Sequence, residues 1–435
     1  METEKDTLTI NEVSQESKDK AVIKQEVYYP ASEVCNELDT LVPKAMFYES
    51  KRFNQRLKTW MAEHNTTVDQ FVMDKLHYTD YDTFCKAFAK EQVDAIASAI
   101  WNFENTGNGL IIADETGVGK GRIGAGLIRY TILELKKTPI FFTEKKHLIA
   151  DIFRDLSGIM FNVSNEDYPN GIPEWVKTSK SVGAKEYTED EIISMIKKDI
   201  ADGELRVDMS FSDYSTIIDS DEFELDSIFN DDNYEMLQEI IDTYGQHLME
   251  ETEEIVYDVN LEYEKQVKQA VKKGMYLVKP FVTFPIQIKD ISGNILYKVT
   301  KTDVDSVLAK GTLPKEYKVI CLTYSQVSRP FDKGGRKLSA KMKFIRKHAN
   351  DSVIIMDESH NASGSQTATG KQSNTSLMLS DIIENSKYTA YISATYAKRP
   401  NNMPIYALRT SIREANISKT QLINAFIRGG LPLQE

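Results

Sequence analysis

Residues 109–122 read GLIIADETGVGKGR, which is a short apolar run followed by a glycine-rich loop and a lysine. The apolar run predicts a strand, and the loop at its end predicts a phosphate-binding site. Glycines in such a loop let backbone N–H groups converge on phosphate oxygens, because a Cβ would block the approach. Lys120 is expected to reach the terminal phosphates as a point charge. Residues 121–135 then predict a helix whose N-terminus faces the same anion.

Two further apolar runs end in polar motifs downstream of this loop. Residues 352–356 precede Asp357-Glu358-Ser359-His360, and residues 388–392 precede Ser393-Ala394-Thr395. A lysine loop, an Asp-Glu-x-His box and a Ser-Ala-Thr segment, in this order, are typical of the first motor domain of superfamily 2 helicases and translocases. We therefore predict an α/β fold, a RecA-like P-loop parallel sheet flanked by helices.

The residues of these motifs are suited to transferring a phosphoryl group from ATP to water, with ATP and Mg²⁺ as the expected cofactors. Lys120 is expected to hold the phosphates, and Asp357 to bind Mg²⁺ directly or through water. Glu358 is expected to orient or deprotonate the attacking water. His360 is expected to link this box to Ser393 and Thr395, which would pass the nucleotide state on to movement between domains.

Eight residues are predicted to contact the nucleotide: Gln92, Thr116, Gly117, Val118, Gly119, Lys120, Gly121 and Arg122. Gln92 lies upstream of the loop at a distance that suits contact with adenine. Its amide offers one donor and one acceptor, which match two neighbouring groups on the adenine edge. The alternative is an ordinary polar residue on a helix.

The loop departs from the usual pattern at Gly121. Most such loops continue from lysine to a serine or threonine whose hydroxyl ligates Mg²⁺. Two consequences are open at this stage. Either phosphates, water and Asp357 are sufficient to hold Mg²⁺, since this ion tolerates few protein ligands, or nucleotide binding is weaker.

The charge of the chain is unevenly distributed. The net charge is −13, but residues 189–258 hold 23 acidic and three basic residues, a net of −20, so the remainder is about +7. The overall acidity therefore does not exclude a nucleic-acid partner. The acidic stretch is either a set of solvated helices or, more specifically, a nucleic-acid mimic or autoinhibitory flap.

No apolar run approaches the roughly 18 residues of a membrane helix, and residues 1–20 lack the core of a signal peptide. We therefore expect no membrane association. Cys35, Cys85 and Cys321 are far apart and lack metal-ligand spacing, so we expect free thiols in a reducing cytoplasm.

The 435 residues are predicted to form five parts. These are a disordered tail (1–26), a helical N-terminal region (27–106), a RecA-like ATP-binding domain (107–160 and 318–410), an acidic α+β insertion (161–317) and the start of a linker to a second domain (411–435). Within the insertion, residues 279–300 predict a hairpin that turns at Ser292-Gly293-Asn294.

Candidate nucleic-acid contacts follow two of the predicted strands: Thr143, Lys145, Lys146, Thr323 and Ser325. Hydroxyls and lysines suit contact with a phosphate backbone, which positions a protein without reading sequence. Residues 333–348 hold seven Lys or Arg and no acid. That stretch is either a solvated helix face or a second polyanion-binding segment.

Several of these stretches resemble the strawberry-notch-like group of superfamily 2 helicases, in particular its phage and mobile-element members. The similar stretches are Leu38–Met46, Glu91-Gln92-Val93-Asp94, Thr116–Arg122, Asp151-x-x-Arg154-Asp155-Leu156 and Thr323-Tyr324-Ser325. The Gly-Lys-Gly ending of the loop is this group's own form. A methyltransferase, which some relatives carry, is not indicated, because no second glycine-rich cofactor loop is found.

The resemblance implies ATP-driven remodelling of, or translocation along, nucleic acid, with double-stranded DNA as the expected partner. It also implies a second RecA-like domain, in cis or in trans, that supplies an arginine finger. Only 40 residues follow Thr395, too few for such a domain, so we expect slow ATP hydrolysis by the chain alone. The expected location is the cytoplasm of a host, or the virion if a phage encodes the chain. The rival hypothesis is a non-motor structural or packaged protein that retains an ATP-binding fold.

Overall fold

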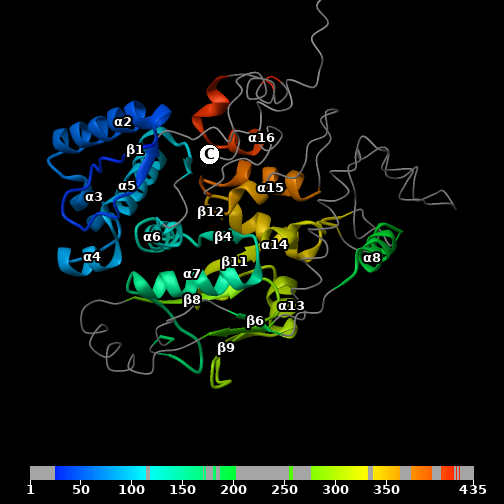
Figure 1. The fold of residues 1–435 in the computed structure, drawn as a ribbon. Helices are drawn as coiled ribbons and strands as arrows, with labels where there is room; N and C mark the ends of the chain where they lie inside the picture. Colours follow the sequence, from blue (N-terminus) through cyan, green and yellow to red (C-terminus); the bar gives the residue numbers. More distant parts are fainter. Residues whose placement is uncertain are drawn as a thin grey trace, which may run out of the picture.

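Figure 1 shows the fold of the chain in the computed structural model. The described residues are 25–113, 118–169, 171–172, 180–182, 187–201, 254–257, 276–331, 337–362, 374–393 and 403–415, with Ser418 and Gln421. Most of the predicted tail, most of the acidic stretch and most of the predicted linker lie outside these residues. Gln25 and Glu26, which we assigned to the tail, belong to a strand.

The N-terminal region is mainly helical, as its sequence periodicity predicts. Its elements are β1 (Gln25–Val27), β2 (Leu41–Pro43), α2 (Lys44–Glu63), α3 (Val68–Lys75), α4 (Tyr81–Ala87) and α5 (Lys90–Thr106). The strands β1 and β2 form a small antiparallel pair. Thr67 is the N-cap of α3, and its hydroxyl accepts a hydrogen bond from the backbone N–H of Gln70. Apolar residues of α3 and α5 are buried between the two helices.

The centre of the molecule is a seven-stranded sheet in which every neighbouring pair is parallel. Its spatial order is β3 (Leu110–Ile112), β13 (Tyr388–Ile392), β12 (Val353–Asp357), β4 (Ile140–Thr143), β11 (Tyr317–Thr323), β8 (Tyr276–Val282) and β5 (Phe161–Val163). The strands consist largely of buried apolar residues, as expected for a parallel sheet covered on both faces. The predicted α/β fold with a parallel sheet is confirmed.

Helices connect successive strands of this sheet. They are α6 (Lys120–Leu133), α7 (Lys146–Gly158), α13 (Lys301–Lys310), α14 (Ala340–Ala349) and α15 (Asn374–Asn385). Right-handed crossovers place α6 and α7 on one face and α13, α14 and α15 on the other, because the chain moves along the sheet in opposite directions in its two halves. The packing agrees, since α6 contacts α7 and α14 contacts both α13 and α15.

The boundary of the insertion differs from the sequence prediction. Strands β5 and β8, which fall within the predicted 161–317 segment, belong to the main sheet. The predicted hairpin is present in β9 (Ile286–Asp290) and β10 (Ile295–Val299), but its first part, residues 279–282, lies in β8. The hairpin joins β6 (Lys180–Val182) and β7 (Glu254–Tyr257) in a separate four-stranded sheet. The described parts of the acidic stretch are the helix α8 (Glu189–Ala201) and the strand β7.

Short elements complete the described fold: the 3-10 turns η2 (Tyr324–Val327), η3 (Ser359–Asn361) and η5 (Ser411–Ala415), and the helix α16 (Met403–Tyr406). None of the described helices combines the length and apolar character that crossing a membrane requires.

Three buried carboxylates hold the segment 28–38 against α3 and α5. Asp94 accepts hydrogen bonds from the backbone N–H groups of Ala31 and Ser32, at 2.6 and 2.7 Å. Asp69 accepts a hydrogen bond from the Ser32 hydroxyl, and Glu91 accepts one from the backbone N–H of Leu38. Each carboxylate thus pairs with backbone or hydroxyl donors of the same segment, which fixes the path of this segment across the helices.

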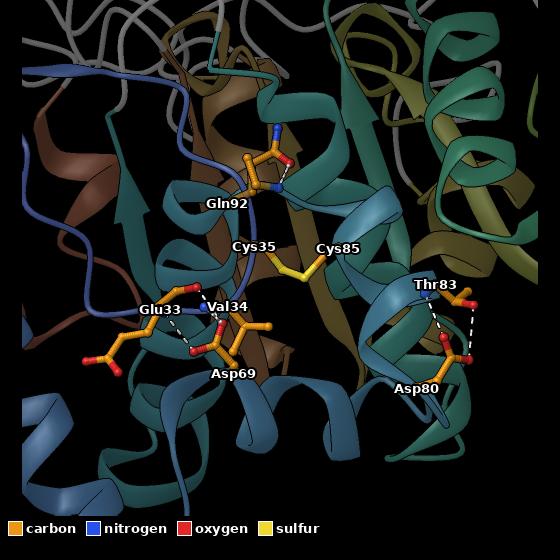
Figure 2. The surroundings of a disulfide bond; sticks show 10 residues. Glu33, Val34, Cys35, Asp69, Asp80, Thr83, Cys85 and Gln92 are labelled. Atoms are coloured by element: carbon orange, nitrogen blue, oxygen red, sulfur yellow. Dashed lines mark hydrogen bonds between the residues drawn. A yellow bond between two sulfur atoms is a disulfide. The ribbon is translucent and has the colours of Figure 1, made fainter.

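The cysteines differ from the sequence prediction. Cys35 and Cys85 form a disulfide, with their Cα atoms 4.8 Å apart (Figure 2). Cys321 is free and buried within β11. The prediction of free thiols is therefore wrong for the first two. They are 50 positions apart in sequence, but the carboxylate-held segment brings Cys35 against α4. Figure 2 shows the disulfide between this segment and α4, in the same region as Gln92.

The stability of this region is expected to fall as pH rises through the titration of Asp94. Burial raises its pKa to about 7, against the opposing effect of its hydrogen-bond donors. In the unfolded chain the pKa of Asp94 is taken as 3.8. Because the pKa is higher in the folded protein, the protonated side chain stabilises the fold fully below pH 3.8, and this stabilisation disappears as the pH rises to about 7. Relative to Asp94→Asn, the wild type should lose about 2–3 kcal/mol of unfolding free energy between pH 5 and 8.

Urea unfolding of both proteins at several pH values measures this difference. The control is Asp82→Asn, which makes the same substitution at an exposed position of α4. A wild-type advantage over Asp94→Asn that is constant, or that grows with pH, would contradict the assignment.

Candidate nucleotide-binding site

The ends of three neighbouring strands meet at one edge of the main sheet. Ile112 of β3 pairs with Ile392 of β13, which in turn pairs with Asp357 of β12. Because these strands are parallel and in register, the residues that follow them emerge at the same level. The carboxyl edge of such a sheet is where α/β proteins bind ligands. The three motifs found in the sequence therefore converge at one place.

The phosphate loop is described from Val118 onward. Gly119 is the N-cap of α6 and has a φ of 77°, in the left-handed region that favours glycine. A Cβ there would also lie 2.4 Å from Nε2 of Gln92. Lys120 is the first residue of α6, so its charge lies at the helix end that attracts anions. Thr116 and Gly117, also predicted to contact the nucleotide, lie outside the described residues.

Gln92 fixes the position of this loop. Its Nε2 donates a hydrogen bond of 2.7 Å to the carbonyl of Val118, and its Oε1 accepts one of 3.0 Å from the backbone N–H of Ala89. The side chain is buried and joins the start of α5 to the loop. The bond to Ala89 caps α5, which agrees with the alternative of a polar residue on a helix, and the bond to Val118 adds a contact to the loop. The Gln92 amide can form further hydrogen bonds beside these two, and its contact with adenine stays a prediction.

Asp357 lies at the end of β12 with its carboxylate turned into the protein. Its Oδ2 accepts a hydrogen bond of 3.0 Å from the hydroxyl of Thr143, at the end of β4. Burial and the neighbouring charge of Glu358 raise its pKa to about 7, while Lys120 acts in the opposite direction. Lys120 is therefore close enough to Asp357 for their charges to interact, as a shared phosphate–metal site requires.

The residues present fit Mg²⁺. A cation beside Asp357 would favour its charged form, which burial otherwise disfavours. No group of three or more His, Cys, Asp or Glu side chains suited to a metal occurs among the described residues. Mg²⁺ at nucleotide sites is usually held by one or two carboxylates together with phosphates and water, so such a group is not needed.

Glu358, His360 and Ser393 form a connected network beneath this edge. The ring nitrogen Nδ1 of His360 shares a hydrogen bond of 2.8 Å with the hydroxyl of Ser393 and lies 3.4 Å from Oε2 of Glu358. The same hydroxyl donates to Oε2 of Glu358 at 3.3 Å. Glu358 has a left-handed backbone with a φ of 49°, which turns the chain sharply after the strand.

The structure thus brings His360 and Ser393 into the contact that the predicted link requires, while the coupling itself stays a prediction. Thr395 lies outside the described residues.

Four of the five predicted nucleic-acid contacts are buried. Thr143 bonds to Asp357, the hydroxyls of Thr323 and Ser325 bond to each other at 2.8 Å, and Lys146 is 2% exposed. These side chains lie inside the protein rather than on a surface that nucleic acid can reach, which differs from the prediction. Lys145 is exposed and is the member of this set available to a partner in the structure.

The basic segment of residues 333–348 is described only from Lys337. Lys347 donates to the carbonyl of Gly311 at 2.8 Å, and Arg346 forms an ion pair with Asp381 at 3.0 Å. Some of its charges therefore have partners in the protein, as expected for an ordinary helix face.

Gly121 and Arg122 face α7. Arg122 donates hydrogen bonds to the carbonyls of Ala87 and Gly158, at 2.7 and 3.2 Å. Its guanidinium thus ties the first turn of α6 to the ends of α4 and α7. This gives Arg122 a structural contact beside its predicted role at the nucleotide.

Sequence reasoning did not assign two residues of this site correctly. Thr143 was predicted to touch nucleic acid but supports Asp357. Tyr324 donates its hydroxyl to the backbone carbonyl of Asp357 at 2.7 Å and stacks on Phe142. Thr143 ends β4, which pairs with β12, and Tyr324 follows β11, the strand on the other side of β4. The ends of these strands at the carboxyl edge of the sheet are the signal that relates both residues to the site.

A family model supports this interpretation of the loop. The model for the family described as P-loop containing NTP hydrolase pore-1 matches residues 24–274, more than half of the chain. The chain belongs to this family. The match includes α5, the phosphate loop and α7 of this P-loop NTP hydrolase, whereas the Asp357 box and Ser393 lie beyond it and join the site through the fold. A search of curated proteins finds no significant match.

Removing the Ser393 hydroxyl is expected to slow nucleotide hydrolysis by this P-loop NTP hydrolase without weakening nucleotide binding. Ser393→Ala deletes the group that bonds to both His360 and Glu358. The lost charge-assisted bond corresponds to roughly a tenfold lower rate. Steady-state hydrolysis and equilibrium binding measure the two effects, with the exposed Ser411→Ala as control. Equal losses of binding and rate would contradict this role.

Proposed function

We propose that this chain is the ATP-binding part of a nucleic-acid-dependent motor that couples ATP hydrolysis to DNA remodelling or translocation. Membership of a P-loop NTP hydrolase family supports NTP hydrolysis. The observation that carries the motor proposal is the Glu358–His360–Ser393 network. It connects Glu358, the carboxylate suited to activating water, with Ser393 at the end of β13. Through this link the state of the bound nucleotide could be transmitted to other parts of the motor.

The residues have distinct roles in the proposed reaction. Lys120 and the backbone N–H groups at the start of α6 bind the phosphates, while Gln92 holds the loop in place. Asp357 is the carboxylate that faces the metal, kept in orientation by Thr143. Glu358 orients the attacking water and receives its proton. Bound Mg²⁺ would neutralise the charge that develops on the phosphate oxygens.

The proposal includes ATP as the nucleotide and a second RecA-like domain that supplies an arginine finger. Such a finger is worth about 10³–10⁵ in rate in related NTPases, so the second domain is expected to accelerate hydrolysis by a factor of this order. The resemblance to strawberry-notch-like helicases supports double-stranded DNA as the partner. The exposed Lys145, beside the site, is a candidate for contact with its phosphates.

Hydrolysis measured with no nucleic acid, single-stranded DNA, double-stranded DNA and RNA tests this function. We expect the rate to rise with nucleic acid, most with double-stranded DNA, and the rise to disappear in Lys120→Ala. The rise should also weaken at higher salt, because phosphate contacts release counterions. A rate that none of the nucleic acids changes would contradict the motor. ATP binding without hydrolysis under any of these conditions would favour the rival, a structural protein that retains the fold.

A further inference from the structure

The loop of this chain lacks an oxygen that most phosphate loops provide. The residue after the loop lysine is usually serine or threonine, and its hydroxyl ligates Mg²⁺. Here that residue is Gly121. A ligand oxygen that is missing from one element can be supplied by another, so the atoms that fill the space of the absent side chain are candidates for that role.

A carboxylate oxygen fills this space. A Cβ built on Gly121 would lie 1.9 Å from Oδ2 of Asp155 and 2.9 Å from its Cγ. No side chain can be accommodated at Gly121 while Asp155 is in this position. The hydroxyl oxygen of a serine lies one bond beyond its Cβ, and Oδ2 of Asp155 occupies space that such a side chain would need.

Asp155 is held in this position from α7. Its carboxylate lies 3.4 Å from the guanidinium of Arg154 and 3.9 Å from Nε of Arg122. Arg122 is itself fixed by the carbonyls of Ala87 and Gly158. The Asp155 side chain is 13% exposed. The position of its carboxylate is therefore set by neighbours rather than by solvent, as expected for an organised ligand.

We propose that Asp155 supplies the Mg²⁺-directed oxygen that Gly121 cannot, acting on the metal of a bound Mg–nucleoside triphosphate directly or through one water. This inference rests on the proposed nucleotide site and deepens it. It gives one reason for the Gly-Lys-Gly ending, since a glycine there leaves room for the carboxylate. It also gives a role to the Asp-x-x-Arg-Asp stretch of α7: Arg154 and Arg122 position Asp155, and Asp155 faces the metal.

Binding of a fluorescent ATP analogue, titrated with Mg²⁺ and repeated in EDTA, tests the proposal. In Asp155→Asn, which keeps the shape of the side chain, we expect at least a tenfold loss of the Mg²⁺-dependent gain in affinity, the size typical of disturbed metal sites. Affinity in EDTA should stay near wild type. Asp151→Asn is the matched control, because Asp151 pairs with the same Arg154 at 3.1 Å, whereas the three atoms nearest to a Cβ on Gly121 all belong to Asp155.

Replacing the Asp155 carboxylate by a hydroxyl at position 121 tests whether Asp155 acts as a metal ligand or only as a structural support. Asp155→Ala combined with Gly121→Ser restores the usual loop hydroxyl, so Mg²⁺-dependent binding should recover relative to Asp155→Ala alone. Gly121→Ser alone should bind poorly, because its Cβ meets the carboxylate.

Three results would overturn the proposal. The first two concern Asp155→Asn: its affinity could depend on Mg²⁺ as in the wild type, or could fall equally with and without Mg²⁺. The third is a double variant that does not recover Mg²⁺-dependent binding. Wild-type protein that binds no nucleotide would instead contradict the nucleotide site itself.

Discussion

Replacing Glu358 with glutamine is expected to slow ATP hydrolysis by about 10²–10⁴-fold, the usual contribution of a positioned acid–base group. Glutamine has nearly the same shape and keeps an oxygen that can accept the Ser393 hydroxyl. It cannot accept a proton from the attacking water. The step that fails is therefore the activation of water, and the structure around it is expected to persist.

Nucleotide binding by Glu358→Gln should equal or slightly exceed that of wild type. The charge of Glu358 raises the pKa of Asp357, so its removal favours the ionised form of the metal-facing carboxylate. Phosphate release and ATP-analogue binding measure the two effects. Glu384→Gln, an exposed position in α15, is the control and should change neither. Hydrolysis within about threefold of wild type would exclude Glu358 as the residue that activates water.

Replacing Arg129 with methionine is expected to destabilise the protein by about 3–5 kcal/mol, because buried hydrogen-bond acceptors lose a charged donor. The Arg129 guanidinium is buried and donates to the carbonyls of Leu76, Ile159 and Met160, at 2.7, 2.9 and 3.3 Å. It also stacks over the ring of Tyr78, 3.9 Å from the centroid. These carbonyls lie at the ends of α3 and α7, so one side chain joins α6 to both helix termini.

Chemical denaturation of Arg129→Met, Arg129→Lys and the exposed Arg52→Met tests this role. Lysine keeps the charge but not the planar set of donors, so its loss should be intermediate. Arg52, which is exposed on α2, should change stability by about 0.5 kcal/mol or less. A small effect of Arg129→Met would show that water or neighbouring groups satisfy the carbonyls.

The sequence was sufficient to predict the strands that form the nucleotide site. Each is an apolar run that ends abruptly in a polar motif, and the observed ends at Ile112, Asp357 and Ile392 follow this pattern. The parallel arrangement follows from helices that alternate with strands. Once these strands are adjacent, the contact between His360 and Ser393 requires only that the motifs lie at the same edge.

Features that depend on distant pairing could not be predicted in the same way. Strand β5 pairs with β8 although more than 100 residues separate them, so no local signal assigned either strand to the main sheet. Cys35 meets Cys85 because buried carboxylates direct an irregular segment, and such segments have no periodicity to interpret. The burial of Thr143 and Thr323 also depends on the final packing, since hydroxyl residues at strand ends suit either a ligand or a support.

We propose that the loop at Lys120 and the box at Asp357 form one site that hydrolyses ATP. Phosphate release from Mg–ATP by the purified chain, measured beside Lys120→Ala, tests it most directly. We predict slow hydrolysis by the wild type that is lost when Lys120 is replaced. Release at the same rate in both proteins, or none in either, would contradict the claim.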